Sequence, residues 1–121
     1  MKTLHFQSVF VGGCGTAAGP MEAQGPLKDK IDKLFDDIYC EEKTYEQAER
    51  RLMSEACDHA LRAQGLKTSD LDLILGGDLL NQLGTSHYFA RDLEIPFIGL
   101  YGACSNSTLI AANAAMWIDS G

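Results

Sequence analysis

The sequence lacks the residue spacings that usually mark metal and redox sites. Its four cysteines are scattered along the chain, and none pairs with another as C-x-x-C. Lysine and arginine form no stripe, and the formal net charge is −7. Because phosphate binding needs clustered cations, nucleic-acid binding is not expected. We therefore expect no metal, no cofactor and no nucleic-acid partner.

Long apolar runs are also missing. No segment approaches the roughly 20 residues that a membrane-spanning helix needs, and the first residues are too polar for a secretory signal. Without an export signal, the default expectation is a reduced intracellular compartment in which cysteines stay free. The 121 residues suffice for one small domain, with an ordinary apolar content of 45%.

What the chain does have is an alternation of apolar strands and amphipathic helices. The clearest helix covers residues 45–64, because Thr44 and Gln47 form a capping box and Gly65 is a typical C-terminal stop. Apolar residues recur within it at helical spacing. The complete prediction is strands at 9–13, 71–76 and 97–101, and helices at 45–64, 86–93 and 105–119.

Strand and helix alternate three times, which predicts an α/β fold with a parallel sheet. Right-handed crossovers would place the three strands side by side in the order 3-2-1. In such sheets the functional crevice lies beyond the carboxyl ends of the strands. The loop at Cys14, the turn at Asp78 and the turn at Cys104 all follow predicted strands. We therefore expect these three groups to share one rim.

Two irregular segments interrupt the alternation. Residues 12–20 are rich in glycine but lack the Gly-Lys-Ser/Thr ending of a phosphate loop, so close backbone approach to a neighbouring element or ligand is the favoured interpretation. Residues 21–43 form a long polar insertion, with a helical turn expected within 31–38. A connection of this length often covers a pocket or a partner surface.

The most informative residue is Cys104, which follows an apolar segment and a small-residue turn at the start of an alanine-rich helix. The partial positive charge of a helix N-terminus contributes at most about 2 kcal/mol, so a nucleophilic thiol would also need a base, usually histidine. The chain offers His5, His59 and His87, and none has a spacing that demands contact with Cys104. Packing of a small side chain at a tight turn is the alternative role.

Several segments together resemble the thiolase-like superfamily, and within it a branch of sporulation proteins. The resemblance covers nearly the whole chain. Its motifs are GTAAGP at 15–20, Glu22 with GPL at 25–27, YEQAER at 45–50, GDLLNQ at 77–82, and IPF at 95–97 leading into GACS at 102–105. Many condensing enzymes share the last motif, whereas the first and the fourth are more specific.

The resemblance implies a thiolase-like subunit built from two similar halves, of which residues 1–121 form a partial N-terminal domain. It also implies a non-catalytic protein that binds dipicolinic acid, free or as its calcium chelate. Such a protein acts with membrane-embedded partner proteins in moving this acid into the developing spore. The expected location is soluble, inside the developing spore and peripheral to its inner membrane. The expected assembly is a homodimer.

Six residues are candidates for the ligand site, namely Cys14, Asp78, Asn81, Cys104, Ser105 and Asn106. The last three are expected to line its anion-binding end, since a helix N-terminus suits a carboxylate. Each of the first three has a structural alternative, either capping of its own turn or packing. The alternative function is acyl transfer by an enzyme similar to ketoacyl synthases and thiolases, with Cys104 as the catalytic nucleophile.

Overall fold

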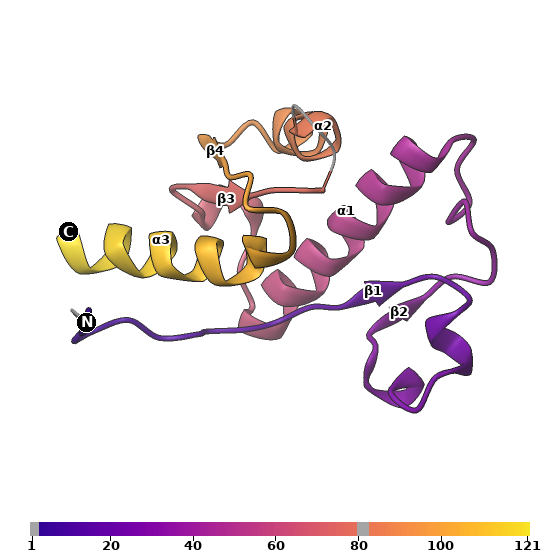
Figure 1. The fold of residues 1–121 in the computed structure, drawn as a ribbon, viewed down its shortest axis with the longest axis horizontal. Helices are drawn as coiled ribbons and strands as arrows, with labels where there is room; N and C mark the ends of the chain where they lie inside the picture. Colours follow the sequence, from indigo (N-terminus) through magenta and orange to yellow (C-terminus); the bar gives the residue numbers. More distant parts are fainter. Residues whose placement is uncertain (1–2, 80–82) are drawn as a thin grey trace.

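The computed structural model describes residues 3–79 and 83–121. Three helices dominate it: α1 (Tyr45–Gln64), α2 (Gly84–Leu93) and α3 (Asn106–Ser120). Four short strands accompany them: β1 (Ala17–Ala18), β2 (Lys33–Leu34), β3 (Ile74–Gly76) and β4 (Phe97–Gly99). The predicted α/β class is confirmed (Figure 1).

Helix α1 begins and ends where its capping residues predict. The Thr44 side chain accepts a hydrogen bond from the Gln47 amide at 3.3 Å, and the Gln47 side chain in turn accepts one from the Lys43 amide at 3.3 Å. At the other end Gly65 adopts φ 66°, a left-handed conformation that suits glycine, and its N–H bonds the last carbonyls of the helix. Both ends of α1 therefore have part of their free backbone groups satisfied.

The prediction of one three-stranded sheet is wrong. The strands form two separate parallel pairs, β1 with β2 and β3 with β4. Residues 9–13 form no strand, and their Phe10 and Val11 side chains are exposed. The glycines that follow lie against α1 instead, since a Cβ on Gly13 or Gly15 would collide with the Ala60 or Ala56 backbone. The expected close backbone approach is thus confirmed, with helix α1 as the neighbour.

The helical turn expected within residues 31–38 is also wrong, because part of this segment is strand β2. Asp32 explains the difference. Its carboxylate accepts hydrogen bonds from the Thr16 amide at 2.9 Å and the Thr16 hydroxyl at 2.8 Å, and its own amide donates to that hydroxyl at 3.0 Å. These bonds align the insertion with β1. Just beyond β2, Phe35 and Cys40 are buried together with Ala48 of α1.

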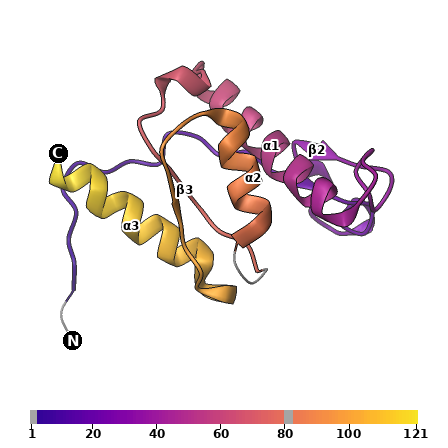
Figure 2. The ribbon, with the colours of Figure 1, turned by 90° about the horizontal axis from the view of Figure 1, so that it is seen from above.

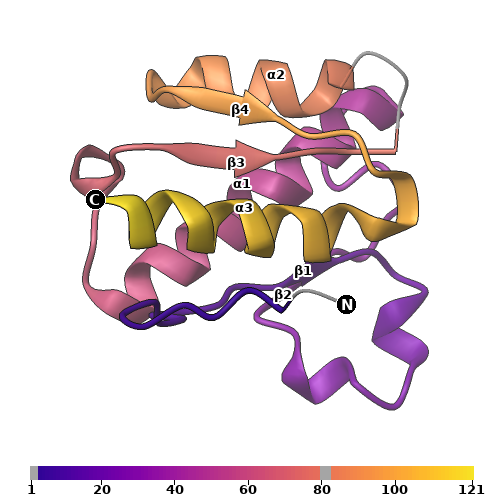
Figure 3. The ribbon, with the colours of Figure 1, turned by 60° about the vertical axis from the view of Figure 1, so that its left-hand side comes forward.

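The second strand pair carries the candidate site. Strands β3 and β4 pair in parallel with Gly76 opposite Gly99, and each is shorter than predicted. Helix α2 packs on α1, and α3 packs along β3. Figures 2 and 3 show α3 running beside this pair, with its first turn at the end to which both strands point. The turns after β3 and β4 therefore meet the start of α3.

Candidate functional site

Two turns form the candidate site, one after β3 and one after β4. They approach closely, because a Cβ on Gly77 would collide with the carbonyl oxygen of Leu100. The backbone holds them in register as well, since the Leu100 amide donates to the Gly76 carbonyl at 2.8 Å. Glycine at position 77 is thus required by close approach.

The Asn106 side chain joins the two turns. Its Nδ2 donates to the Asp78 carbonyl at 3.0 Å, and its Oδ1 accepts from the Gly102 amide at 2.5 Å. Asn106 opens helix α3, so one side chain links the ends of both strands to the start of this helix. Two of the three groups that the sequence places on one rim, the Asp78 turn and the Cys104 turn, therefore do meet.

The Asp78 carboxylate faces helix α2. It accepts hydrogen bonds from the Ser86 amide at 2.9 Å and the Ser86 hydroxyl at 2.6 Å, and both residues are buried. Thr85, the residue before Ser86, donates a hydrogen bond from its hydroxyl to the Glu49 carboxylate of α1 at 2.9 Å. Asp78 thus holds the first turn of α2, eight residues further along the chain, which is a structural role that the sequence analysis did not predict.

Cys104 belongs to the second of these turns and is an exposed free thiol. It follows Ala103, whose φ of 47° is a conformation that costs a residue with a Cβ roughly 1–2 kcal/mol. Ser105 secures this sharp turn, since its hydroxyl donates to the Gly102 carbonyl at 2.6 Å. The sequence predicts the tight turn, and the structure adds the left-handed residue before the cysteine.

The first turn of α3 contains no negatively charged side chain of its own. The side chain of Ser105, its N-terminal capping residue, makes no capping hydrogen bond, and the turn contains no acidic residue. The N-terminal amides of a helix carry partial positive charge and favour carboxylates. Cys104, Ser105 and Asn106 therefore stand at a helix start that favours an anionic group electrostatically.

The remaining candidates have other surroundings. The glycines on either side of Cys14 lie against α1, and the Cys14 thiol is exposed. Cys14 is thus held by α1, whereas Asp78 and Asn106 lie where the two turns meet. Asn81 lies outside the described residues. Burial raises the pKa of the Cys40 thiol, with added repulsion from Asp37, and burial also raises the pKa of the Cys57 thiol. The last two thiols are consequently poor nucleophiles.

The histidines lie beside other elements. His87 meets the Phe97 ring edge-on, with 5.4 Å between ring centroids, and its Nε2 lies near Gly99. His59 lies near Gly15 and contributes a minor electrostatic share to the lowered pKa of Asp32. The described residues include no group of three or more His, Cys, Asp or Glu side chains that could hold a metal.

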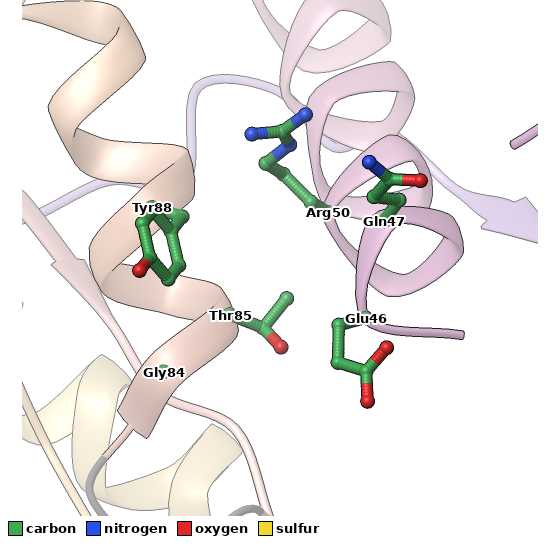
Figure 4. Close-up of a pocket in the computed structure, with 6 residues that line it drawn as sticks. All are labelled: Glu46, Gln47, Arg50, Gly84, Thr85 and Tyr88. Atoms are coloured by element: carbon green, nitrogen blue, oxygen red, sulfur yellow. The ribbon is translucent and has the colours of Figure 1, made fainter. Parts of the chain in front are cut away.

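A groove between α1 and α2 is a feature that the sequence analysis missed. It has a volume of about 290 Å³ and lies between the first turns of the two helices (Figure 4). Its lining residues are Glu46, Gln47, Arg50, Gly84, Thr85 and Tyr88. No sequence motif marks it, because it arises only from the packing of two helices that are distant in sequence.

Comparison of the sequence with known proteins identifies the family. The fold defines a broad class, namely α/β proteins with a cysteine in the turn between a parallel strand and a helix. A family profile identifies the family within this class. The profile described as stage V sporulation protein AD (SpoVAD) matches residues 1–121. The chain is 48% identical to stage V sporulation protein AD of Bacillus subtilis (strain 168) over 113 residues, which is 93% of the chain. The chain belongs to the stage V sporulation protein AD family.

The chain spans 33% of the length of this curated relative. Membership of the family supports a role in sporulation and, with it, an association with the developing spore. Among the described residues, no helix is long and apolar enough to cross a membrane.

Proposed function

We propose that this chain belongs to a non-catalytic, thiolase-like protein that binds dipicolinic acid and acts in its uptake into the developing spore. One observation carries the proposal. The exposed Cys104 turn and the first turn of α3, which has neither a side-chain cap nor an acidic residue, lie together at the end of a parallel strand pair. This is a suitable end for a site that takes a small carboxylate.

The negative charge of the ligand favours the N-terminus of α3 over the rest of the surface. Dipicolinate is a small, flat dianion, and the chain carries a net charge of −7. Most of the surface therefore repels it, whereas the N-terminus of α3 attracts one of its carboxylates. The second carboxylate would need a cation or further donors from elsewhere in the full-length protein.

We also propose that the chain is the first part of a larger subunit with two similar halves. Only Ala115 of α3 is buried, while Met116, Trp117 and Ile118 are exposed. A cavity of about 570 Å³ lies between the end of α3 and the segment around β3. Together with the greater length of the relative, this apolar surface supports additional cover from the rest of the protein, as in a thiolase-like homodimer. Membrane-embedded partner proteins remain part of the proposal.

Titration calorimetry with the full-length protein tests the ligand and the site together. The wild type should bind dipicolinate, and Cys104→Ala and Asn106→Leu should each weaken binding at least about tenfold, equivalent to about 1.4 kcal/mol. Asn113→Leu is a matched control, because Asn113 lies on the same helix and bonds only the Leu109 carbonyl of its own turn. Unchanged affinity in both site variants would remove these residues from the site.

The acyl-transfer alternative has its own test. The structure places His59 near Gly15 and His87 against Phe97, and the rest of the full-length protein could supply a histidine to Cys104. Incubation of that protein with acyl-CoA, followed by mass spectrometry, should leave Cys104 without an acyl adduct. A stoichiometric adduct on Cys104 would replace the binding function with a condensing or acyl-transfer enzyme.

A further inference from the structure

The strained turn before Cys104 depends on a chain of side-chain contacts that begins in a different element. Ala103 keeps its φ of 47° only if the residues around it hold the turn, because such a backbone persists when the surrounding structure determines it. Within the turn, the Ser105 amide and hydroxyl both donate to the Gly102 carbonyl. The opposite side of Gly102, its amide, is held from outside the turn by Asn106.

Asn106 is held in turn by the peptide of Asp78. Its Nδ2 donates to the Asp78 carbonyl at 3.0 Å, which orients the amide plane so that Oδ1 faces the Gly102 amide. The position of the Asp78 peptide therefore decides where the Asn106 side chain can point. An error in that position would pass directly to Gly102 and to the turn that presents Cys104.

The Asp78 side chain is fixed by Ser86. Ser86 has no exposed surface, and its amide and hydroxyl both donate to one carboxylate oxygen at 2.9 Å and 2.6 Å. Hydrogen bonds to an ionised carboxylate are about twice as strong as neutral ones. Ser86 belongs to the first turn of α2, so this helix is linked to the β3 turn across eight residues of chain.

We infer that Ser86 and Asp78 are positioning residues for the Cys104 turn. They act through the Asp78 carbonyl and Asn106, and they do not touch the ligand. This inference rests on the proposed function for its ligand-binding readout alone, because the geometry of the turn can also be measured without ligand. The inference gives α2 a role in the site, although this helix is distant in sequence from Cys104.

The experiment compares Ser86→Ala with Thr85→Ala in the full-length protein. The two residues are adjacent in the first turn of α2 and both are buried, but Thr85 bonds Glu49 of α1 and not the β3 turn. Ser86→Ala should weaken dipicolinate binding by about tenfold, because the turn that presents Cys104 would lose its support from α2. Thr85→Ala should change binding less than twofold, although it removes a buried hydrogen bond too.

A double-mutant cycle separates positioning from general destabilisation. If Ser86 acts through Asn106, then Ser86→Ala should have little further effect on binding in an Asn106→Leu background. Independent, additive losses would overturn the inference, and so would an equal loss in Thr85→Ala. The ligand-free readout is hydrogen exchange at the Gly102 amide, whose protection should fall about tenfold in Ser86→Ala and stay unchanged in Thr85→Ala.

The two readouts keep this inference distinct from the proposed function. If the wild type fails to bind dipicolinate, the proposed function falls, and the exchange of the Gly102 amide alone decides whether Ser86 and Asp78 position the turn. Unchanged Gly102 exchange in Ser86→Ala overturns the positioning role, whatever the ligand.

Discussion

Single atoms decide the geometry of the Cys104 turn. Asn106 is the clearest case, since its amide oxygen and nitrogen bond two different turns and neither a shorter nor an apolar side chain could do both. Ser105 shows a different division of labour. Its hydroxyl bonds the Gly102 carbonyl and does not cap α3, so it stabilises the turn. Asn106 and Ser105, both candidates for ligand binding, thus also stabilise the turn.

At the same scale, Gly77→Ala should disturb the site without any change of charge. The new Cβ would collide with the Leu100 carbonyl and approach Asn106 Nδ2 to 3.1 Å. We expect a loss of about 1–3 kcal/mol in the free energy of unfolding, measured by urea denaturation of the full-length protein. Gly84→Ala is the control, because its Cβ meets no atom of the described residues within 4 Å and alanine favours a helix. Equal stability of the two variants would contradict the close approach of the turns.

Among the helices and strands, those with local signals could be predicted from the sequence. The ends of α1 were predictable because Thr44 and Gly65 act locally, through hydrogen bonds to residues within the same helix turn. Strand β2 was not predictable, since its partner is β1 and the bonds between Thr16 and Asp32 cross 16 residues. The expected strand at 9–13 failed for a related reason. An apolar run predicts burial, but Phe10 and Val11 remain exposed in the described structure.

Strand pairing between β1 and β2 should depend on pH. Hydrogen bonds from Thr16 hold the pKa of Asp32 below its ordinary value, with a smaller contribution from His59. A carboxyl with a lowered folded-state pKa stabilises the fold above its unfolded value of about 3.9 and loses that contribution as the pH falls through the folded value. The β1–β2 pair should therefore loosen only below about pH 4.

The readout for this pair is protection of the Phe35 amide, which donates to the Ala18 carbonyl across it at 3.0 Å. Protection measured from pH 6 to pH 3 should fall in the wild type in the acid range. Thr16→Val, which removes the hydroxyl but keeps the backbone amide, should show weaker protection already at pH 6. Identical profiles in the two proteins would show that the Asp32 hydrogen bonds do not hold the strands together.

At the scale of the whole molecule, α3 has more apolar surface than the described chain covers. Trp117 is the single tryptophan and its side chain is exposed next to Ile118. In the full-length protein we expect this face to be covered. The Trp117 contribution, taken as the difference between the wild type and Trp117→Phe, should then emit at shorter wavelength and resist acrylamide quenching. In residues 1–121 alone it should emit like an indole in water.

In the candidate site, too, the features set by neighbouring residues could be predicted, and those set by distant contacts could not. The Cys104 turn was predictable because a strand, small residues and a helix start follow one another in the sequence. The meeting of this turn with Asp78 followed from the pairing of β3 and β4. Cys14 was grouped with them on the assumption of a third strand in the same sheet, and its glycine loop lies against α1 instead. The buried Ser86 gave no signal, since a serine in a helix carries no pattern.

The central claim is that dipicolinate binds beside Cys104, and ligand protection of that thiol tests it most directly. Cys104 and Cys14 are both exposed free thiols, so Cys14 is an internal control. Iodoacetamide alkylation of the full-length protein, resolved by mass spectrometry of the two peptides, should slow at Cys104 by about tenfold with saturating dipicolinate and stay unchanged at Cys14. Equal alkylation of Cys104 with and without dipicolinate would contradict the account.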